Sequence, residues 1–398
     1  MDTSEIAQFE DHCRDAVLEL RGALIDLFRD VGSDPTRPQD VARRFSLNKN
    51  LTWKIAKIVG AKCAFDAVEQ VPGTGGMKIL LASMREANAS EVVVRRVEDA
   101  MDRYEEMIQI HVGDRVSLDL MLDGMGSDKS KLIKSRKLVY QGSTGLWGIQ
   151  ADARITAQFL APSKEDPARV DIAQVTGLKR VRRLRQIDRW DLFRFVRMND
   201  ESHPNVRVPI DIDEQGCPGL MREFCDDVIP ELRVEKGKQT INIELGPGPV
   251  GKTGEFSAYF GYQYPSCESR YAKDGDDEAY MFSSVSMPAR VLLFDLFVHK
   301  DLYPLIDPRV NLFGNPWSSG NQKDDKTRIQ VHESLQDLGR GANISTAFTV
   351  NYPRVVERTF DSMGWVSEDF YCMRLEIDYP PMGSSVGVSF RLPQNPER

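Results

Sequence analysis

Residues 38–57, with the sequence PQDVARRFSLNKNLTWKIAK, carry the clearest structural pattern in the chain. The segments from Pro38 to Phe45 and from Lys49 to Val59 each have the apolar spacing of a short helix. Gly60 ends the second segment, and the small Ala42 inside the first leaves room for a second helix to cross it closely. The sequence therefore predicts two short helices joined by a tight turn.

This stretch resembles the helix-turn-helix unit of transcriptional regulators, including those of the winged-helix kind. Apolar residues stand where the two helices of such a unit meet: Val41, Phe45, Leu47 and Ile55. Two positions depart from the pattern, because Ser46 replaces the usual turn glycine and Thr52 replaces a β-branched apolar residue. The resemblance covers about residues 20–80 and implies a sequence-specific DNA-binding regulator.

Helix geometry adds candidate binding residues to this resemblance. One face of the second helix carries Leu51, Ile55 and Val59 and is expected to pack on its neighbours. The opposite side would enter the major groove of duplex DNA with Lys49, Asn50, Lys54 and Lys57. Two residues of the first helix, Arg43 and Arg44, would contact phosphates. A homodimer would supply two such helices, with residues 90–112 as the candidate dimer seam.

Other interpretations of the helix pair remain open. Similar pairs serve as dimerisation modules, for example at the front of some O-methyltransferases. Trp53 on the outward face suits a protein contact better than base recognition, and its burial in a subunit interface would indicate a non-catalytic assembly protein. Residues 1–125 contain 16 Lys and Arg against 22 Asp and Glu, and this negative balance opposes strong DNA affinity.

The rest of the chain predicts a second domain of mixed structure. With 398 residues and 41% hydrophobic residues, the chain can form more than one core. Alternating apolar residues from about position 153 onward are typical of strands, and helices are predicted at 217–226 and 352–363. The fold class is therefore α+β: an all-helical domain with the helix-turn-helix over residues 1–125, and a larger mixed α+β domain over residues 126–398. This second domain would sense a small-molecule effector or hold the oligomer together.

A glycine-rich segment, Gly246-Pro-Gly-Pro-Val-Gly-Lys-Thr253, has P-loop spacing and follows a predicted strand. Pro247 and Pro249 remove two of the backbone N–H donors that would bind phosphate, so a nucleotide loop is not expected. The preceding Glu244-Leu-Gly-Pro-Gly248 is similar to the first glycine loop of S-adenosylmethionine-dependent methyltransferases. A strand–loop–helix at this place would support that enzyme, and a β-hairpin would argue against it.

The sequence predicts no catalytic residues, no metal site and no cofactor. Gly383-Ser-Ser-Val-Gly387 has the spacing of a nucleophile elbow, but the last histidine, His332, precedes it, and hydrolases of that kind have the opposite order. No apolar run is long enough for a membrane span, and no signal-peptide core is present. Six scattered cysteines without a CxxC pair fit reduced thiols, so we expect a cytoplasmic protein.

Overall fold

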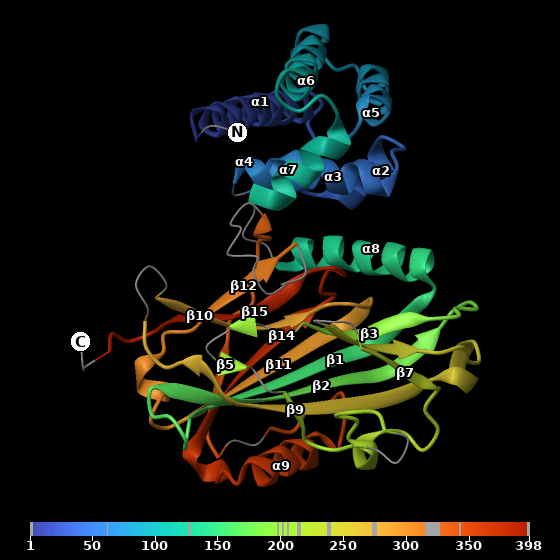
Figure 1. Cartoon of the computed structure of the whole chain (residues 1–398). Coiled ribbons are helices and arrows are strands. Elements are labelled where there is room, and N and C mark those ends of the chain that lie inside the picture. The colour runs from blue at the N-terminus through green and yellow to red at the C-terminus, as the bar shows by residue number, and fades with distance from the viewer. Residues whose placement is uncertain are drawn as a thin grey trace. The chain divides into compact units, whose positions relative to one another are not determined.

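The computed structural model describes residues 3–61, 63–125, 129–196, 199–200, 203–204, 207–212, 216–236, 240–272, 277–314, 327–341 and 344–395. The chain divides into two compact units, Met1–Asp128 and Lys129–Arg398. The first unit is helical and the second is dominated by β-strands (Figure 1), which confirms the predicted α+β class.

The helical unit is built from consecutive helices joined by short connections. They are α1 (Thr3–Asp30), α2 (Pro38–Arg44), α3 (Lys49–Gly60), α4 (Ala64–Val68), α5 (Thr74–Glu86), α6 (Glu91–His111) and α7 (Arg115–Met125). The core forms mainly between α1 and α6, because α1 repeats apolar residues every three or four positions. Phe9, Leu20 and Phe28 of α1 are fully buried there, beside Tyr104 of α6.

The turn between α2 and α3 places a left-handed backbone conformation at Ser46, the position where the sequence pattern usually has glycine. Ser46 adopts φ 53°, in the left-handed region where glycine is usual. The Asn48 side chain then caps α3 by accepting a hydrogen bond from the Asn50 N–H at 2.8 Å. The predicted packing face is confirmed, since Leu51, Ile55 and Val59 are buried.

The larger unit is centred on a mixed sheet with the strand order β13-β14-β11-β1-β2-β9-β6. Its central strands are β1 (Ile149–Pro162) and β11 (Ala289–His299), which run parallel, while the other pairs are antiparallel. The flanking strands are β2 (Arg169–Arg183), β9 (Phe256–Ser269), β6 (Val208–Pro209), β14 (Phe370–Asp378) and β13 (Gln336–Arg340).

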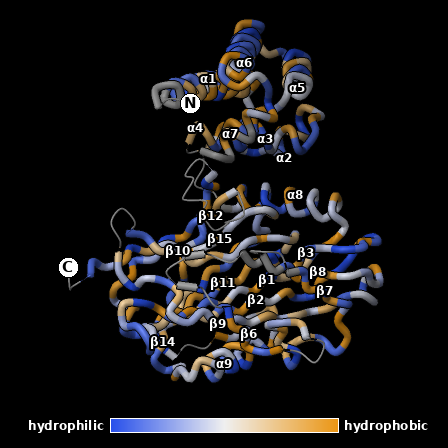
Figure 2. The backbone as a smooth tube through the Cα atoms, in the orientation of Figure 1, coloured by the Kyte–Doolittle hydropathy of each residue, from blue (hydrophilic) through white to orange (hydrophobic). Residues whose placement is uncertain are grey.

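Both faces of this sheet are covered. Helix α9 (Tyr352–Met363) packs on one face, where Phe159 of β1 and Phe297 of β11 stack with ring centroids 4.5 Å apart. The other face packs against a three-stranded sheet of β10 (Glu278–Ser284), β15 (Ser385–Arg391) and β12 (Arg309–Phe313). Burial on both faces explains the nearly continuous apolar run of β11. Figure 2 shows hydrophobic residues concentrated along these strands.

The remaining elements lie at the margins of the unit. Helix α8 (Lys129–Trp147) leads into β1, and Figure 1 shows it on the opposite side of the sheet from α9. Another sheet has the order β3-β8-β7, from Trp190–Val196, Thr240–Leu245 and Leu232–Lys236, and two short strands, β4 (Asn199–Asp200) and β5 (His203–Pro204), pair with each other. The helix predicted at 217–226 is wrong, because only one 3-10 turn, Arg222–Phe224, forms there after glycines with positive φ at Gly216 and Gly219.

Candidate functional site

The outward side of α3 is exposed as the sequence predicted. Lys49, Asn50, Lys54 and Lys57 are all exposed. Trp53 lies among them with 48% of its surface accessible. The structure thus brings four of the predicted DNA-binding residues onto one surface, with a large indole in its middle.

The two arginines of α2 both have partners within the helical unit. Arg44 donates to the Val31 and Gly32 carbonyls just beyond the end of α1, both at 2.7 Å. Its guanidinium also lies over the Phe45 ring, 5.1 Å from the centroid. Arg43 pairs with Asp40 at 2.6 Å. Arg44 therefore ties α2 to the end of α1, and the charge of Arg43 is partly compensated.

The glycine-rich segment after β8 is a packed turn. One 3-10 turn, Gly251–Gly254, separates β8 from β9, and no α-helix follows. The buried guanidinium of Arg183 donates to the Gly246 carbonyl. A side chain at Gly248 would come within 2.7 Å of the same guanidinium. The strand–loop–helix that the methyltransferase interpretation requires is therefore missing, and this alternative is wrong.

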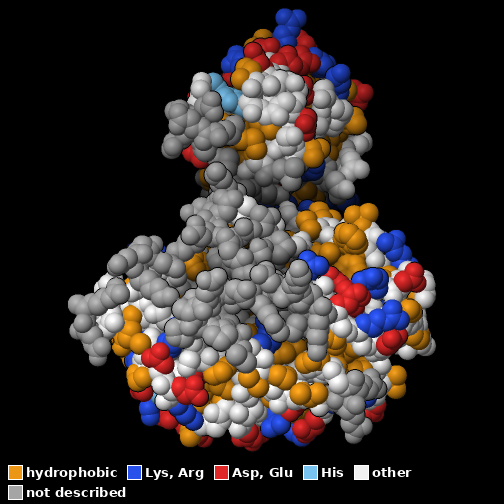
Figure 3. Space-filling model, in the orientation of Figure 1, with side chains coloured by type: hydrophobic (Ala, Val, Ile, Leu, Met, Phe, Trp, Pro, Cys, Tyr) orange, Lys and Arg blue, Asp and Glu red, His pale blue; other side chains and the backbone are white. Residues whose placement is uncertain are grey.

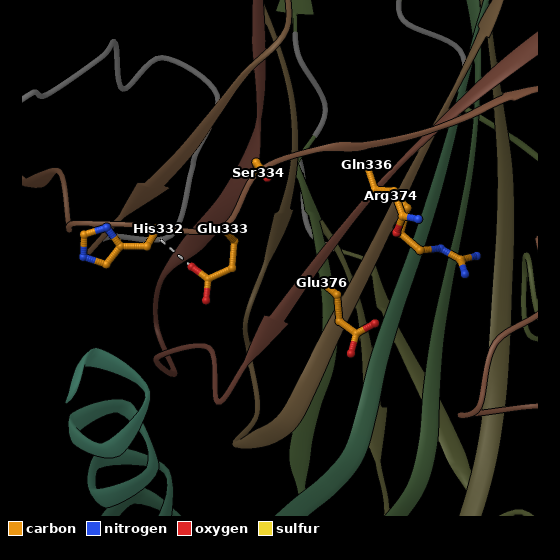
Figure 4. Close-up of a pocket in the computed structure, with 6 residues that line it drawn as sticks. All are labelled: His332, Glu333, Ser334, Gln336, Arg374 and Glu376. Atoms are coloured by element: carbon orange, nitrogen blue, oxygen red, sulfur yellow. Dashed lines mark hydrogen bonds between the residues drawn. The ribbon is translucent and has the colours of Figure 1, made fainter. Parts of the chain in front are cut away.

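A polar cavity of about 280 Å³ lies at the β13–β14 end of the larger unit. Six residues line it: His332, Glu333, Ser334, Gln336, Arg374 and Glu376. The segment before β13 supplies the first three, β13 supplies Gln336, and β14 supplies the last two (Figure 4). Gln336 and Arg374 are cross-strand partners in the register of β13 and β14. Antiparallel pairing thus brings together residues about 40 positions apart.

Buried ion pairs hold the two charged walls of the cavity. The Glu333 carboxylate faces the Arg136 guanidinium of α8, with oxygen–nitrogen distances of 2.5 and 3.5 Å. Both side chains are nearly inaccessible, at 3% and 4% exposure. On the other wall, Arg374 binds the fully buried Asp295 of β11 through two hydrogen bonds of 2.8 and 2.7 Å. These two walls are therefore preorganised and compensated in charge.

The Asp295 network extends to α9 and to the segment before it. Tyr352 donates to Asp295 at 2.8 Å, and burial raises the Tyr352 pKa well above its usual value, so the hydroxyl keeps its proton. Arg374 also donates to the carbonyls of Ile344 and Ser345, each at 3.0 Å. The position of Arg374 is consequently fixed by β11 and by residues 344–345.

Hydrogen-bonding groups remain for a ligand inside the cavity. The side chains of Ser334 and Gln336 are exposed and make no hydrogen bond with any described residue. His332 approaches Gln330 through Nε2 at 3.1 Å, while its backbone N–H donates to Glu333. A hydroxyl, an amide and an imidazole can each donate or accept, so the cavity suits a polar molecule.

Comparisons with known proteins give distant structural matches. A crystal structure of an M1 zinc metallopeptidase from Deinococcus radiodurans is 9% identical, with 61% of this chain and 42% of that chain covered and a TM-score of 0.26. A protein described as a putative protease from Parabacteroides distasonis ATCC 8503 is 6% identical, with 61% of this chain and 40% of that chain covered and a TM-score of 0.26. The matches therefore span less than half of those chains. No family model and no curated protein matches the sequence.

The predicted DNA-binding transcriptional regulator is corrected on the structure of α2 and α3, where both arginines predicted to contact phosphates are engaged within the helical unit. The chemistry of α2 and α3 explains why the sequence pattern misled. Arg44 is used inside the unit, Arg43 is paired, and Trp53 occupies the middle of the surface that would face bases. The peptidase likeness is too distant to assign an activity. In the part of the chain that the structure describes, no three His, Cys, Asp or Glu residues cluster as metal ligands.

The cavity residues were not predicted from the sequence. In the sequence, His332 was considered only for its order relative to Gly383–Gly387, and Arg374 and Glu376 lie in the part of the chain whose alternation predicted only strands. The one available signal was the alternation of charged residues with apolar ones along β14, where Arg374 and Glu376 share a face. Among the described helices, none combines the length and apolar composition needed to cross a bilayer.

Proposed function

We propose that the chain is a non-catalytic binding protein whose larger unit holds a small polar molecule in the cavity at its β13–β14 end. The observation that carries this proposal is that the charged lining residues are held in place by buried partners, whereas other lining side chains are available to bind a ligand. Glu333 and Arg374 are held by buried partners, while Ser334 and Gln336 offer their side chains to the cavity. Such rigid walls reduce the ordering cost of binding.

The ligand that fits best is a neutral, hydroxyl-rich molecule of about monosaccharide size. The cavity of about 280 Å³ lies just below the usual range of about 300–1,000 Å³ for ligand sites, which favours a small ligand. The Arg374 and Glu333 charges are already compensated by Asp295 and Arg136, so no ligand charge is required to balance them. Hydroxyl groups both donate and accept, which matches the mixed groups of Ser334, Gln336 and His332.

The test is a binding screen by saturation-transfer NMR with neutral monosaccharides and polyols, and with amino acids and inorganic phosphate as comparison classes. We expect a hydroxyl-rich compound to bind and its signal to be lost in Ser334→Ala and Gln336→Ala. Gln109→Ala, a matched change on an exposed helical residue, should leave the signal intact. If no hydroxyl-rich compound binds, or if binding survives both cavity variants, the proposal is wrong.

A further inference from the structure

Helix α8 presents large apolar side chains away from the sheet. Leu138 and Leu146 are 61% and 74% exposed, and Val139 is 50% exposed, whereas the half-exposed Trp147 is turned to the Trp190 ring of β3. Figure 3 shows hydrophobic side chains gathered over this part of the larger unit. Exposed apolar groups concentrated on one helix indicate a surface that another protein segment covers.

Two glycines lie within this surface. Gly142 and Gly145 are inside α8 and exposed, and a side chain added at either position would meet nothing within 4 Å. Glycine destabilises a helix interior relative to alanine, so nothing in the unit itself favours these two residues. Between Leu138 and Leu146 they form a shallow notch that lets the backbone of a second helix approach closely.

The charge of α8 restricts what can occupy this surface. The helix contains five Lys and Arg and no Asp or Glu. Lys134 and Lys137 are exposed beside the apolar residues. Two α8 helices would therefore repel each other, and an occupant with carboxylates beside apolar side chains is favoured.

Helix α6 of the same chain has this complementary character. Its outward side carries Asp99, Asp102 and Glu106, which form no ion pair among the described residues, between the exposed Val92 and Ile110. Two of the three arginines on this helix are turned to α1, since Arg96 pairs with Asp26 and Arg103 with Glu19, while the exposed Arg95 lies 3.9 Å from Glu91 of α6 itself. The acidic groups of α6 are thus left to face outward.

We propose that α8 of one copy of the chain binds α6 of a second copy. In a two-fold dimer this contact would be reciprocal, with each α8 on the partner's α6. Lys134 and Lys137 would face the carboxylates of α6, while Leu138 and Leu146 would pack beside Ile110. This inference goes beyond the polar cavity and does not depend on it.

The experiment is a charge exchange in the full chain, followed by sedimentation velocity at low and high salt. One variant combines Lys134→Glu with Lys137→Glu, and the other combines Asp102→Lys with Glu106→Lys. Each alone places like charges at both contacts, so we expect dimerisation to weaken on the order of tenfold or more at low salt. All four residues are exposed, so neither variant should unfold the chain.

Mixing the two variants distinguishes a contact between copies from any contact within one chain. In the mixture, an acidic α8 meets a basic α6 and a basic α8 meets an acidic α6, so dimers should reappear. Lys252→Glu and Glu357→Lys, which reverse exposed charges elsewhere, should dimerise like the wild type.

Three results would overturn the proposal. The wild-type chain could stay monomeric at all concentrations tested, or its dimer could be indifferent to both double variants, or the mixture could fail to restore dimers. A flotation assay with anionic phosphatidylserine vesicles tests whether α8 binds a lipid surface instead. Vesicle binding that is lost in Leu146→Glu, in a chain that stays monomeric, would assign the surface to lipid instead.

Discussion

Asp295 is a fully buried carboxylate in the middle of an otherwise apolar strand. It accepts two hydrogen bonds from Arg374 and one from Tyr352. An aspartate inside a hydrophobic run is costly unless its charge is paired and hydrogen-bonded. Here the three bonds join β11, β14 and α9. Asp295 therefore helps to fix the position of the Arg374 side chain in the cavity, together with the Ile344 and Ser345 carbonyls.

We predict that Asp295→Asn lowers the free energy of unfolding by about 3–5 kcal/mol, because the change leaves Arg374 as a largely buried charge without its counter-ion. Urea denaturation followed by circular dichroism measures the effect. A loss below about 1 kcal/mol would show that Arg374 finds solvent or another partner when Asp295 is neutral.

Arg154 provides the contrasting case. It is buried in β1, donates to Ser283 at 3.0 Å and lies over the Phe193 ring, with no carboxylate pairing with it among the described residues. Burial lowers the Arg154 pKa to about 10, so it is still a cation at neutral pH. Arg154→Met should therefore be neutral or stabilising by about 1 kcal/mol in the same denaturation assay, since it removes a buried charge and orphans no acid.

At the scale of elements, the turn between α2 and α3 stores strain at a single residue. Ser46 has φ 53°, a conformation that costs a residue with a side chain roughly 1 kcal/mol relative to glycine. We predict that Ser46→Gly raises the melting temperature of the helical unit and that Ser46→Val lowers it. Differential scanning calorimetry of the full chain resolves the two changes, and equal melting temperatures for the two variants would contradict the prediction.

Elements with a strong period were predictable from the sequence, and elements set by long-range contacts were not. The four-residue spacing of Leu51, Ile55 and Val59 predicted the packed face of α3, and the helix predicted at 352–363 agrees with α9. The segment at 217–226 is apolar enough for a helix, but Leu220 instead forms a bridge with Phe260 of β9. The cavity depends on the register of β13 against β14, which no local pattern encodes.

At the scale of the whole molecule, buried cysteine thiols and a buried tyrosine hydroxyl make the stability of both units decrease at alkaline pH. Burial raises the Cys13 pKa to about 11 in the helical unit. In the larger unit, burial raises the pKa of Cys267 and of Tyr259 to about 12. Above the ordinary pKa values of 9.0 for cysteine and 10.0 for tyrosine, the unfolded chain releases these protons and the folded chain retains them.

We therefore predict that stability is constant with respect to these groups below about pH 9 and falls between about pH 9 and 12. Each group contributes a slope of about 1.4 kcal/mol per pH unit between its unfolded and folded pKa values. Urea unfolding at pH 8 and pH 10 under reducing conditions measures the fall. Cys267→Ala should show a shallower fall than the wild type, and identical pH profiles would refute the assignment.

The parallel pairing of β1 with β11 has a consequence for how the chain folds. Ala153 lies opposite Val291, so the centre of the main sheet joins segments nearly 140 residues apart, and β14 must then add from residues 370–378. Loops this long close slowly, whereas β2 follows β1 directly in the chain and pairs with it. During synthesis, the helical unit and the β1–β2 pair can be complete while β1 still waits for β11, with one apolar edge exposed to aggregation. Folding of the larger unit should therefore limit the yield of folded protein, and this yield should depend on temperature and on chaperones.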